Sequence, residues 1–442
     1  MLNRLLRRNA TPSLKKILSR THPADLAQVI DHFMPQQKLK LLFLVGDDKR
    51  QAEVLECMRV PQAVDLIHEL PLERTLALLS RMSADDRADI LGALDEELAS
   101  QILAAMPDEE SDQATELLRY GESTAGGIMS PDFLAIAEDV TAHDAIRIVQ
   151  NSPDVEMVFY IYVVSTHGLL VGVVSLRQLV TSRPEVKLSE FMNPNVVAVH
   201  TQEDQEEVAR VVSRYNFLAV PVVDKTNTLV GVVTVDDVID VIREEATEDI
   251  LKLAGTGEDL DEKQTIPRSV LKRAPWLFAA WLGGVVASFV IGHFEGTLQR
   301  YVPLATFIPI LLGMAGNVGT QSLTIVVRGL AMRRIEIKHF WSVTIREIFV
   351  GIILGVIYGA SLGAMGFFQL YDNVQINAMM MAIVVASSAA VSMTMAALVG
   401  ASTPLLFARI HVDPAVATGP FVTTTIDVIG VIVYFNMARL LF

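Results

Sequence analysis

Five long apolar segments near the C-terminus constrain the fold of this chain more than any other feature. The first, "APWLFAAWLGGVVASFVIG" (274–292), runs for about 19 residues without a charged side chain, enough to cross the ~30 Å hydrocarbon core of a bilayer. Four more segments of this kind follow at roughly 302–328, 343–370, 377–407 and 415–438. The sequence therefore predicts an α-helical transmembrane domain of five helices over 273–442.

The charge of the chain is divided unequally along its length. The formal net charge is -15, although the mean hydropathy of +0.39 is that of an apolar chain. From Arg273 onward there are nine basic and six acidic residues, whereas 27 basic and 45 acidic residues precede it. An acidic, water-soluble region thus comes before the membrane segments. Such a region repels nucleic acid and attracts cations, so no nucleic-acid partner is expected.

Loop charges predict the orientation of the spans. The connection between the second and third spans contains Arg328, Arg333, Arg334 and Lys338, whereas the next connection contains "YDN" at 371–373. Basic residues accumulate in cytosolic loops. The acidic region is therefore expected in the cytosol, and the odd number of spans places the C-terminus outside. The expected location is the cell (inner) membrane, as a multi-pass protein.

Residues 1–125 have the pattern of a stack of short helices. Stretches such as "PLERTLALLSRM" and "ADDRADILGALD" carry apolar residues at helical spacing, and Pro, Ser or Asp begins several of them. A loose recurrence about every dozen residues favours a stacked-helix array over a sheet domain. We expect an acidic, all-α superhelical N domain over 1–125.

A duplicated α/β unit follows the helical region. "YIYVVSTHGLLVGVVSLRQLV" and "LAVPVVDKTNTLVGVVTVDDVI" align and share "LVGVV". "IMSPDFLAIAEDVTAHDAI" and "FMNPNVVAVHTQEDQEEV" resemble the openings of the two repeats in a tandem CBS domain pair. The resemblance implies an α/β CBS pair over 126–248, which leaves 249–272 as a connecting, plug-type helix before the first span.

Two stretches interrupt the apolar character of the spans. In "PILLGMAGNVGTQS" (309–322), several glycines, Asn317 and Gln321 fall within one span. Glycine at this density lets backbones approach closely and can unwind a helix, which is tolerated at membrane depth beside a wet cavity. The Asn317 amide and freed carbonyls are then candidate oxygen ligands. Helix packing through small residues alone is the alternative.

The second stretch is "HVDPAVATGPFVTTTIDVIG" (411–430), where Asp427 lies about three turns inside the last span. A charge at mid-bilayer costs about 2.5–3.5 kcal/mol, so an acid there indicates a water-filled path or a cation. Thr423 lies one turn earlier on the same face. A two-fold dimer would supply two carboxylates and leave the waters that Mg²⁺ retains. A protonated acid hydrogen-bonded between helices is the competing explanation.

The order of an acidic helical domain, a CBS pair and five spans resembles the MgtE family of magnesium channels and transporters. "PILLGMAGNVGTQSLTIVVRGLA" and "DPAVATGPFVTTTIDVIGVIVYF" resemble the two most recognisable membrane motifs of that family. The resemblance implies a homodimer in the lipid bilayer with a pore on the dimer axis. It also implies that Asp427 holds a hydrated Mg²⁺ in that pore, with Asn317 and the backbone of Gly316 nearby.

Two positions depart from the family pattern. Ala315 stands where many members carry a second glycine before the asparagine, and Gly419 stands where some carry Asn at the pore mouth. Both departures bear on relative ion selectivity. The predicted pore residues are Asp427, Asn317, Gly316, Gly419 and Thr423.

Acidic residues also cluster at helical spacing in the soluble region. Like charges at i, i+4 repel, so we expect the clusters to separate without Mg²⁺ and to be bridged by it, which compacts the domains and closes the pore. The family resemblance points to the same residues, although each one alone also fits a solvated helix face. The predicted regulatory residues are Asp85, Asp89, Asp204, Glu206, Asp237, Asp240, Glu245, Glu248, Asp249 and Asp413.

The CBS resemblance also points to ATP or another adenosine nucleotide as a ligand. In "GVVTVDD", Thr234 and Asp237 are placed to bind a phosphate and a ribose. The first repeat has Gln178 at the equivalent ribose position. We therefore expect one nucleotide site per pair, on a residue that the regulatory cluster also uses.

The combined prediction is a non-enzymatic, Mg²⁺-selective channel or transporter. It moves divalent cations down the electrochemical gradient into the cytosol and is shut by Mg²⁺ on its acidic domains. Two alternatives stay open: a CBS-regulated transporter of another divalent cation such as Co²⁺ or Mn²⁺, and a dimeric intramembrane aspartyl protease. The sequence contains no Walker loop, nucleophile triad or hydrolytic zinc spacing, which disfavours ATP-driven pumping.

Overall fold

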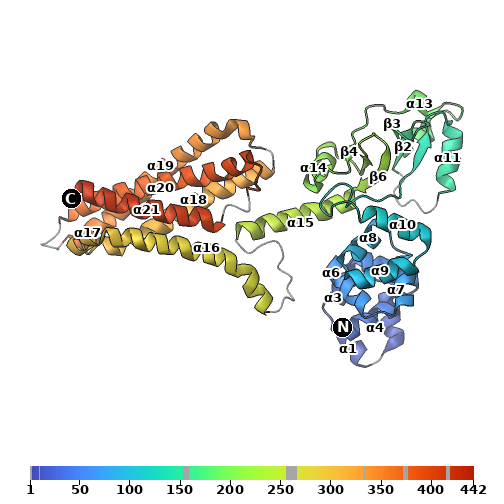
Figure 1. The fold of residues 1–442 in the computed structure, drawn as a ribbon, viewed down its shortest axis with the longest axis horizontal. Helices are drawn as coiled ribbons and strands as arrows, with labels where there is room; N and C mark the ends of the chain where they lie inside the picture. Colours follow the sequence, from blue (N-terminus) through green and yellow to red (C-terminus); the bar gives the residue numbers. More distant parts are fainter. Residues whose placement is uncertain are drawn as a thin grey trace. The chain divides into compact units, whose positions relative to one another are not determined.

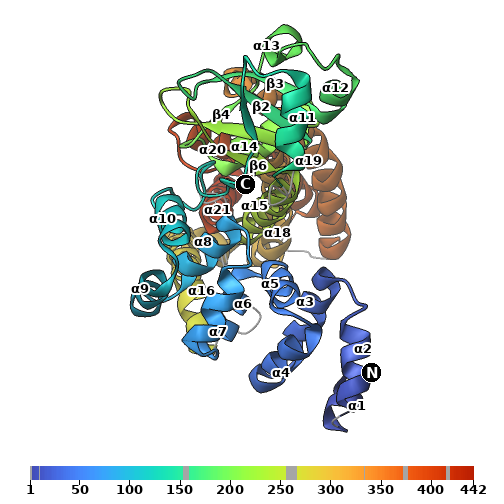
Figure 2. The same ribbon diagram turned by 90° about the vertical axis from the view of Figure 1, so that its right-hand side faces the viewer.

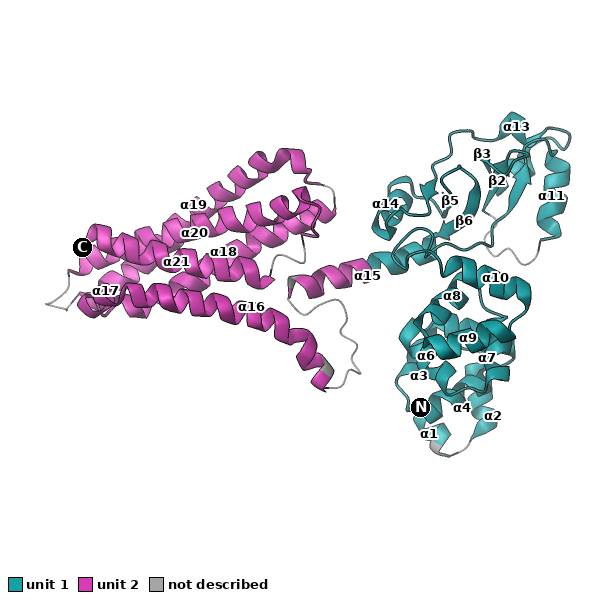
Figure 3. Cartoon of the chain, viewed as in Figure 1, with its two compact units in different colours: residues 1–243 teal, residues 244–442 magenta. Residues whose placement is uncertain are grey.

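The chain forms two compact units, Met1–Arg243 and Glu244–Phe442 (Figures 1 and 3). The first unit contains short helices and two small sheets, and the second contains the long apolar helices. The computed structural model describes residues 2–8, 10–152, 159–254, 266–332, 334–371, 377–414 and 419–442.

The first unit opens with short helices in succession, which Figure 2 shows as a curved array. Their bounds are α1 (Leu2–Arg7), α2 (Thr11–Leu18), α3 (Pro23–Asp31), α4 (Pro35–Val45), α5 (Asp48–Glu56), α6 (Val60–His68), α7 (Leu72–Leu79), α8 (Ala84–Ala93), α9 (Glu96–Ala105) and α10 (Asp108–Leu117). Proline occupies the first or second position of α2, α3, α4 and α6, where its missing N–H has no helical partner to lose. The predicted all-α N domain is confirmed.

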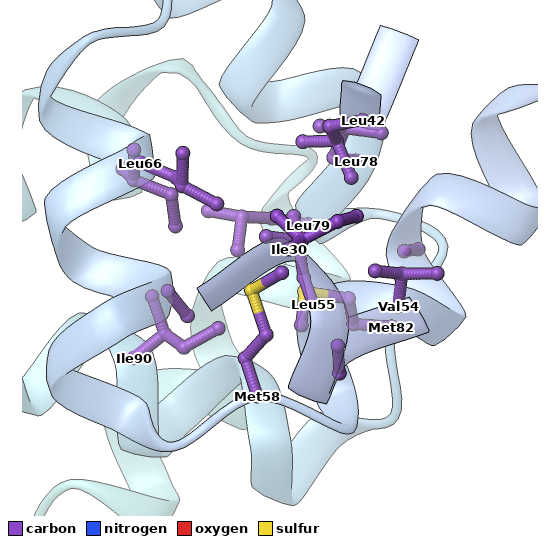
Figure 4. Packing of buried hydrophobic residues seen from close by; sticks show 14 of the residues in the cluster. Ile30, Leu42, Val54, Leu55, Met58, Leu66, Leu78, Leu79, Met82 and Ile90 are labelled. Atoms are coloured by element: carbon purple, nitrogen blue, oxygen red, sulfur yellow. The ribbon is translucent and has the colours of Figure 1, made fainter. Parts of the chain in front are cut away.

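One hydrophobic core runs through this array. Leu55, Leu66 and Leu78 lie in it with at most 2% of each residue exposed (Figure 4). The array also buries a charge, since Lys38 Nζ lies 2.7 Å from Asp31 Oδ1. The other oxygen of Asp31 accepts a hydrogen bond from Gln62 Nε2 at 2.7 Å. The buried ammonium is tolerated because it is paired and its partner is hydrogen-bonded.

Two three-stranded sheets of identical topology follow. The first orders β1 (Ala135–Ala137), β2 (Tyr160–Val164) and β3 (Leu170–Ser175), and the second orders β4 (Val199–His200), β5 (Ala219–Val223) and β6 (Leu229–Thr234). In each sheet the first pair is parallel and the second antiparallel. The accompanying helices are α11 (Ala142–Gln150), α12 (Leu176–Thr181), α13 (Leu188–Phe191) and α14 (Gln205–Tyr215). This repeat confirms the predicted CBS pair.

The second repeat is joined to both of its neighbours. The two hairpin turns meet, where Leu170 N donates to Asn227 O at 3.1 Å. On another side, Ala84 and Ala88 of α8 enter the core that contains Val208 and Val238. The acidic residues next to these alanines are thereby placed beside the start of α15 (Val235–Leu253).

Within the described residues, five helices of the second unit are long and apolar enough to cross a membrane. They are α16 (Ile266–His293), α18 (Leu304–Ala331), α19 (Phe340–Leu370), α20 (Ala378–Arg409) and α21 (Gly419–Leu441), with α17 (Glu295–Arg300) and the 3₁₀ helix η1 (Ile337–His339) between them. The predicted five-helix fold is confirmed. The predicted connecting helix over 249–272 falls on the end of α15 and the start of α16, and its residues 255–265 lie outside the described ranges.

Glycines set the spacing of the long helices. On α19 they recur every four residues, and a Cβ added at Gly355 would lie 2.7 Å from the carbonyl oxygen of Ala390 on α20. A Cβ at Gly400 of α20 would lie 2.2 Å from the carbonyl oxygen of Gly319 on α18. The backbones therefore approach as closely as small-residue packing in membranes allows.

Candidate functional site

Asp427 is a partly exposed carboxylate inside α21. It lies eight residues after Gly419, which begins the helix, or about 12 Å along its axis. Its neighbour Ile426 is buried, whereas Asp427 and Thr423 are both of intermediate exposure. In the described part of the chain, no hydrogen bond or ion pair reaches the Asp427 side chain. The described part of this chain therefore leaves the carboxylate available to a ligand.

Thr423 lies one turn before Asp427 on α21. Its hydroxyl donates within the helix, with the carbonyl oxygens of Gly419 and Pro420 each 3.1 Å away. The lone pairs of the Thr423 oxygen remain available as acceptors. Thr423 can thus present oxygen to a cation or to its water shell beside Asp427.

The glycine-rich α18 is one continuous helix, so the predicted unwinding is wrong. A Cβ added at Gly313 or Gly316 would meet nothing within 4 Å, so no neighbour forces the backbone apart there. A helix that breaks at membrane depth must find new partners for its backbone groups, whereas a continuous one satisfies them internally. The carbonyl of Gly316 therefore stays in the helical ladder, and the Asn317 side chain is the stronger candidate ligand.

One face of α18 is polar and exposed. Asn317, Thr320, Gln321 and Thr324 follow helical spacing and are all exposed. Polar side chains at this depth are costly against lipid, so the face is suited to water or to another protein surface. The opposite face is buried, and there Ala315 is fully enclosed.

The two membrane motifs lie against one another. A Cβ at Gly319 of α18 would come within 2.1 Å of Ile426 Cδ1 on α21. Ala315 joins Val422 and Ile426 in one buried cluster. The turn that carries Asn317 therefore packs beside the turn that carries Asp427. The departure at Ala315 concerns the contact between these helices.

α19 contains a buried acid that the sequence analysis did not select. Glu347 is 3% exposed, and its Oε2 accepts a hydrogen bond from Ser322 Oγ of α18 at 3.0 Å. Arg346 Nη2 lies 3.2 Å from the other oxygen. The position of Glu347 near the end of a predicted span made it look like an interfacial residue. Its burial depends on the packing of three helices, which the sequence does not display.

Asp85 and Asp86 of α8 and Asp237 of α15 are near enough to influence one another's pKa. Burial raises the pKa of Asp86 to about 8, Asp85 adds to this effect, and the hydrogen bond from Ser83 opposes it. Burial raises the pKa of Asp237 to about 7, and Asp85 contributes again, against the hydrogen bond from Thr234. One oxygen of Asp85 is buried without a hydrogen-bond partner. Asp86 was not predicted, because its burial arises from tertiary packing.

The other predicted acids of the first unit are more dispersed. Asp204 caps α14 by accepting from Glu206 N at 2.9 Å, and Asp89 and Glu206 are exposed. Asp240 pairs with Arg243 at 3.4 Å on an exposed face. Within the described ranges, no three Asp, Glu, His or Cys side chains gather as a group that could hold a metal ion.

Lys252 gathers the predicted acids at the end of α15. Its Nζ lies 2.9 Å from Asp413 Oδ2 and also pairs with Glu248. Burial lowers the pKa of Lys252, but the two carboxylates outweigh it and the net pKa is raised. Burial, with Asp413 next in effect, raises the pKa of Asp249. Glu245, one turn before Asp249, is of intermediate exposure. Lys252 was not predicted.

The candidate nucleotide residues form a helix cap. Thr234 N donates to Asp237 Oδ2 at 3.3 Å, and the Thr234 hydroxyl donates to the same oxygen. Ser175 and Gln178 form the equivalent capping box in the first repeat. Asp237 is therefore shared between this cap and the neighbourhood of Asp85.

Family models match three parts of the chain. The model described as the MgtE intracellular N domain matches residues 21–123, and the CBS domain model matches 125–185 and 188–244. The MgtE model, described as a divalent cation transporter, matches residues 308–437.

Individual proteins match over nearly the whole chain. The magnesium transporter MgtE of Thermus thermophilus is 37% identical over 446 residues, which cover 100% of this chain and 97% of that protein. The Bacillus subtilis magnesium transporter MgtE is 34% identical, covering 94% and 93%. A crystal structure of the cytosolic domain of the Mg²⁺ channel MgtE in complex with ATP has a TM-score of 0.52 and 37% identity, covering 54% of this chain and 98% of that one. This chain therefore belongs to the MgtE family of magnesium transporters.

Proposed function

We propose that this chain carries Mg²⁺ down its electrochemical gradient into the cytosol through a path lined by Asp427, and that cytosolic Mg²⁺ closes the path. The first unit lies in the cytosol in this proposal, and the C-terminus lies outside. Membership in a transporter family sets aside the protease alternative. Co²⁺ and Mn²⁺ remain as competing substrates to be measured.

The observation that carries the pathway is the unpaired state of Asp427. Glu347, the other acid in these helices, is buried and hydrogen-bonded, as a structural carboxylate in a membrane must be. Asp427 is half-buried and has no such partner among the described residues. A carboxylate left unpaired at this depth is explained by water and a cation beside it.

In this proposal the path lies in a homodimer. Each chain offers a single Asp427, and Mg²⁺ sheds its waters reluctantly and prefers octahedral oxygen. Two carboxylates facing one another across a two-fold axis would hold the ion through its retained waters. The exposed polar face of α18, with Asn317 and Gln321, would then border the same aqueous path.

Ion flux in proteoliposomes tests the pathway. Asp427→Asn keeps the shape of the side chain and removes its charge. We expect Mg²⁺ flux to fall at least about tenfold, the equivalent of losing one charge-assisted interaction. Glu336→Gln is the control, because Glu336 is exposed outside the long helices and pairs with Lys338. Undiminished flux in Asp427→Asn would exclude Asp427 as the ion site, and parallel assays with Co²⁺ and Mn²⁺ give the ranking of substrates.

The acids at α8 and α15 support regulation by Mg²⁺. Burial and Asp85 raise the pKa values of Asp86 and Asp237. We expect a divalent cation to displace the protons of these two acids, bind beside Asp85 and draw α8 toward α15. We expect Asp85→Asn to require more internal Mg²⁺ for closure than the wild type. Asp65→Asn, an exposed change elsewhere in the array, should leave the closing concentration unaltered.

An adenosine nucleotide at the CBS pair is a further part of the proposal. A solved relative was crystallised with ATP, and Thr234 and Asp237 occupy the candidate site here. Because Asp237 also lies beside Asp85, nucleotide and Mg²⁺ would compete for it or bind together. Calorimetric titration with ATP should show binding that Asp237→Asn weakens and that Asp236→Asn, at the exposed neighbour, does not.

A further inference from the structure

The buried acid Glu347 has no role in the proposed path, although it occupies a costly position. It stands four residues before Gly351, at the end of the row in which glycines recur every four residues on α19. Only 3% of Glu347 is exposed. The other positions of this row hold the smallest residue, so close packing alone does not require a long acidic side chain here.

Both oxygens of Glu347 are engaged. Ser322 Oγ donates to Oε2 at 3.0 Å from α18, and Arg346 Nη2 lies 3.2 Å from Oε1. The Arg346 side chain is 66% exposed, whereas that of Glu347 is 4% exposed. The acid thus joins an exposed cation to a buried hydroxyl on another helix. Such a bond fixes the rotation and depth of α18 more strictly than apolar contacts do, because it is directional.

The turn of α18 that donates this bond directly follows the turn that carries Asn317. Ser322 follows Gln321 and lies five residues after Asn317. Gly319, three residues before Ser322, packs so closely on Ile426 that a Cβ there would lie 2.1 Å from Cδ1. A displacement at Ser322 would therefore be transmitted to the residue that precedes Asp427.

We propose that Glu347 is a positioning residue for Mg²⁺ transport. Through Ser322 it holds α18 at the rotation and depth where Asn317 and Asp427 border one path. The inference rests on the proposed path along Asp427. The positioning of α18 comes from the hydrogen bond between Glu347 and Ser322, whereas Arg346 balances the charge of Glu347.

A set of variants in proteoliposomes tests the bond. Ser322→Ala and Glu347→Leu each remove it, and Glu347→Gln keeps an acceptor oxygen for the hydroxyl. We expect the first two to lower Mg²⁺ flux about tenfold and to reduce the ratio of Mg²⁺ to Co²⁺ flux, since loss of a hydrogen bond to a charged group is about that large. Glu347→Gln should keep most of the Mg²⁺ flux and most of the Mg²⁺ to Co²⁺ flux ratio. The double variant Ser322→Ala/Glu347→Leu should be no worse than Glu347→Leu alone.

Thr344→Val is the matched control. Thr344 lies three residues before Glu347 and is fully buried, and its hydroxyl has no hydrogen-bond partner among the residues that the structure describes. Loss of the Thr344 hydroxyl should leave Mg²⁺ flux and the Mg²⁺ to Co²⁺ flux ratio unchanged. Unchanged transport in Ser322→Ala, additive effects in the double variant, or equal loss in Glu347→Gln and Glu347→Leu would each overturn the proposal. Normal flux in Asp427→Asn would instead remove the path on which it rests, whatever Ser322→Ala does. Melting temperatures of each variant in detergent separate these results from misfolding.

Discussion

At the scale of single residues, the carboxylates of this chain differ chiefly in what surrounds them. Asp427 is half-buried and unpaired in the described part of the chain, Glu347 is buried and hydrogen-bonded, and Asp86 is partly buried beside another acid. The first environment leaves a charge available to a mobile cation, the second satisfies the charge internally, and the third favours the protonated form. In the proposal, the same functional group serves conduction at Asp427 and positioning at Glu347, whereas at Asp86 its raised pKa lets it titrate near neutral pH.

Asp86 makes the stability of the first unit depend on pH. Burial raises its folded pKa to about 8 from the ordinary value of 3.8, so between these two pH values the folded state binds a proton that the unfolded state has released. The contribution of Asp86 to stability is complete below its unfolded pKa and is lost as the pH rises through its folded pKa. Without Mg²⁺, we expect the free energy of unfolding to fall by about 3 kcal/mol between pH 5 and pH 8 from this group.

Thermal unfolding across this pH range measures the effect. Asp86→Asn cannot titrate, so its stability should decline less steeply, and the remaining slope should reflect Asp237, whose pKa is raised to about 7. Asp112→Asn, at an exposed position of α10, should retain the wild-type slope. A parallel decline in Asp86→Asn and wild type would contradict the assignment.

The sequence was sufficient to select Asp427 and insufficient for Asp86 and Glu347. An acid in the middle of an apolar span is unusual within its own segment, so local context alone identifies it. Asp86 belongs to an ordinary charged helix, and Glu347 lies near the end of its span. Their surroundings include residues remote in the sequence, Asp237 of α15 for Asp86 and Ser322 of α18 for Glu347.

At the scale of elements, glycine decides how closely the long helices pack. Hydropathy located these helices because length and composition suffice for that purpose. Hydropathy did not show whether a glycine unwinds its helix or admits a neighbour. In α18 the glycines serve close packing and do not unwind the helix. Gly319 leaves room for the side chain of Ile426, and the helix continues without a break.

Two adjacent glycines of α16 provide a matched test of this packing. A Cβ at Gly283 would lie 2.3 Å from Thr424 Cβ on α21, whereas a Cβ at Gly284 would meet nothing within 4 Å. We expect Gly283→Ala to lower the melting temperature in detergent and to reduce Mg²⁺ flux, because it displaces the segment between Thr423 and Asp427. Gly284→Ala should match the wild type in both measurements. Equal melting temperatures and equal Mg²⁺ flux in the two variants would show that close packing of α16 on α21 at Gly283 is not required.

At the scale of the whole molecule, α15 is the helix that belongs to both units. Its first turns carry Asp237, and its last turns carry Glu248 and Lys252. The repeats and the spans were predictable because each is a local pattern. The continuity of this helix from Val235 to Leu253 and its pairing with Asp413 were not, because the pairing joins residues 161 positions apart.

Lys252 is expected to influence how flux responds to internal Mg²⁺. Its ammonium neutralises part of the charge of Glu248, Asp249 and Asp413. In Lys252→Met these carboxylates repel one another when no cation is bound, so flux at low internal Mg²⁺ should exceed that of the wild type. At high internal Mg²⁺ the two should converge. Lys225→Met, at an exposed turn, is the control, and identical curves for Lys252→Met and wild type would refute the expectation.

The row of glycines on α19 has a consequence for folding in the membrane. A contact that repeats every four residues coincides with itself when one helix slides along the other by about 6 Å. Gly355 and Gly359 would then meet equivalent small-residue surfaces of α20, so this interface alone discriminates poorly between neighbouring alignments. The bond between Glu347 and Ser322 does not repeat. That bond joins α19 to α18, and α18 in turn packs on α20 where Gly319 meets Gly400. Through α18, one buried charge can therefore favour a single alignment of α19 and α20 over its neighbours.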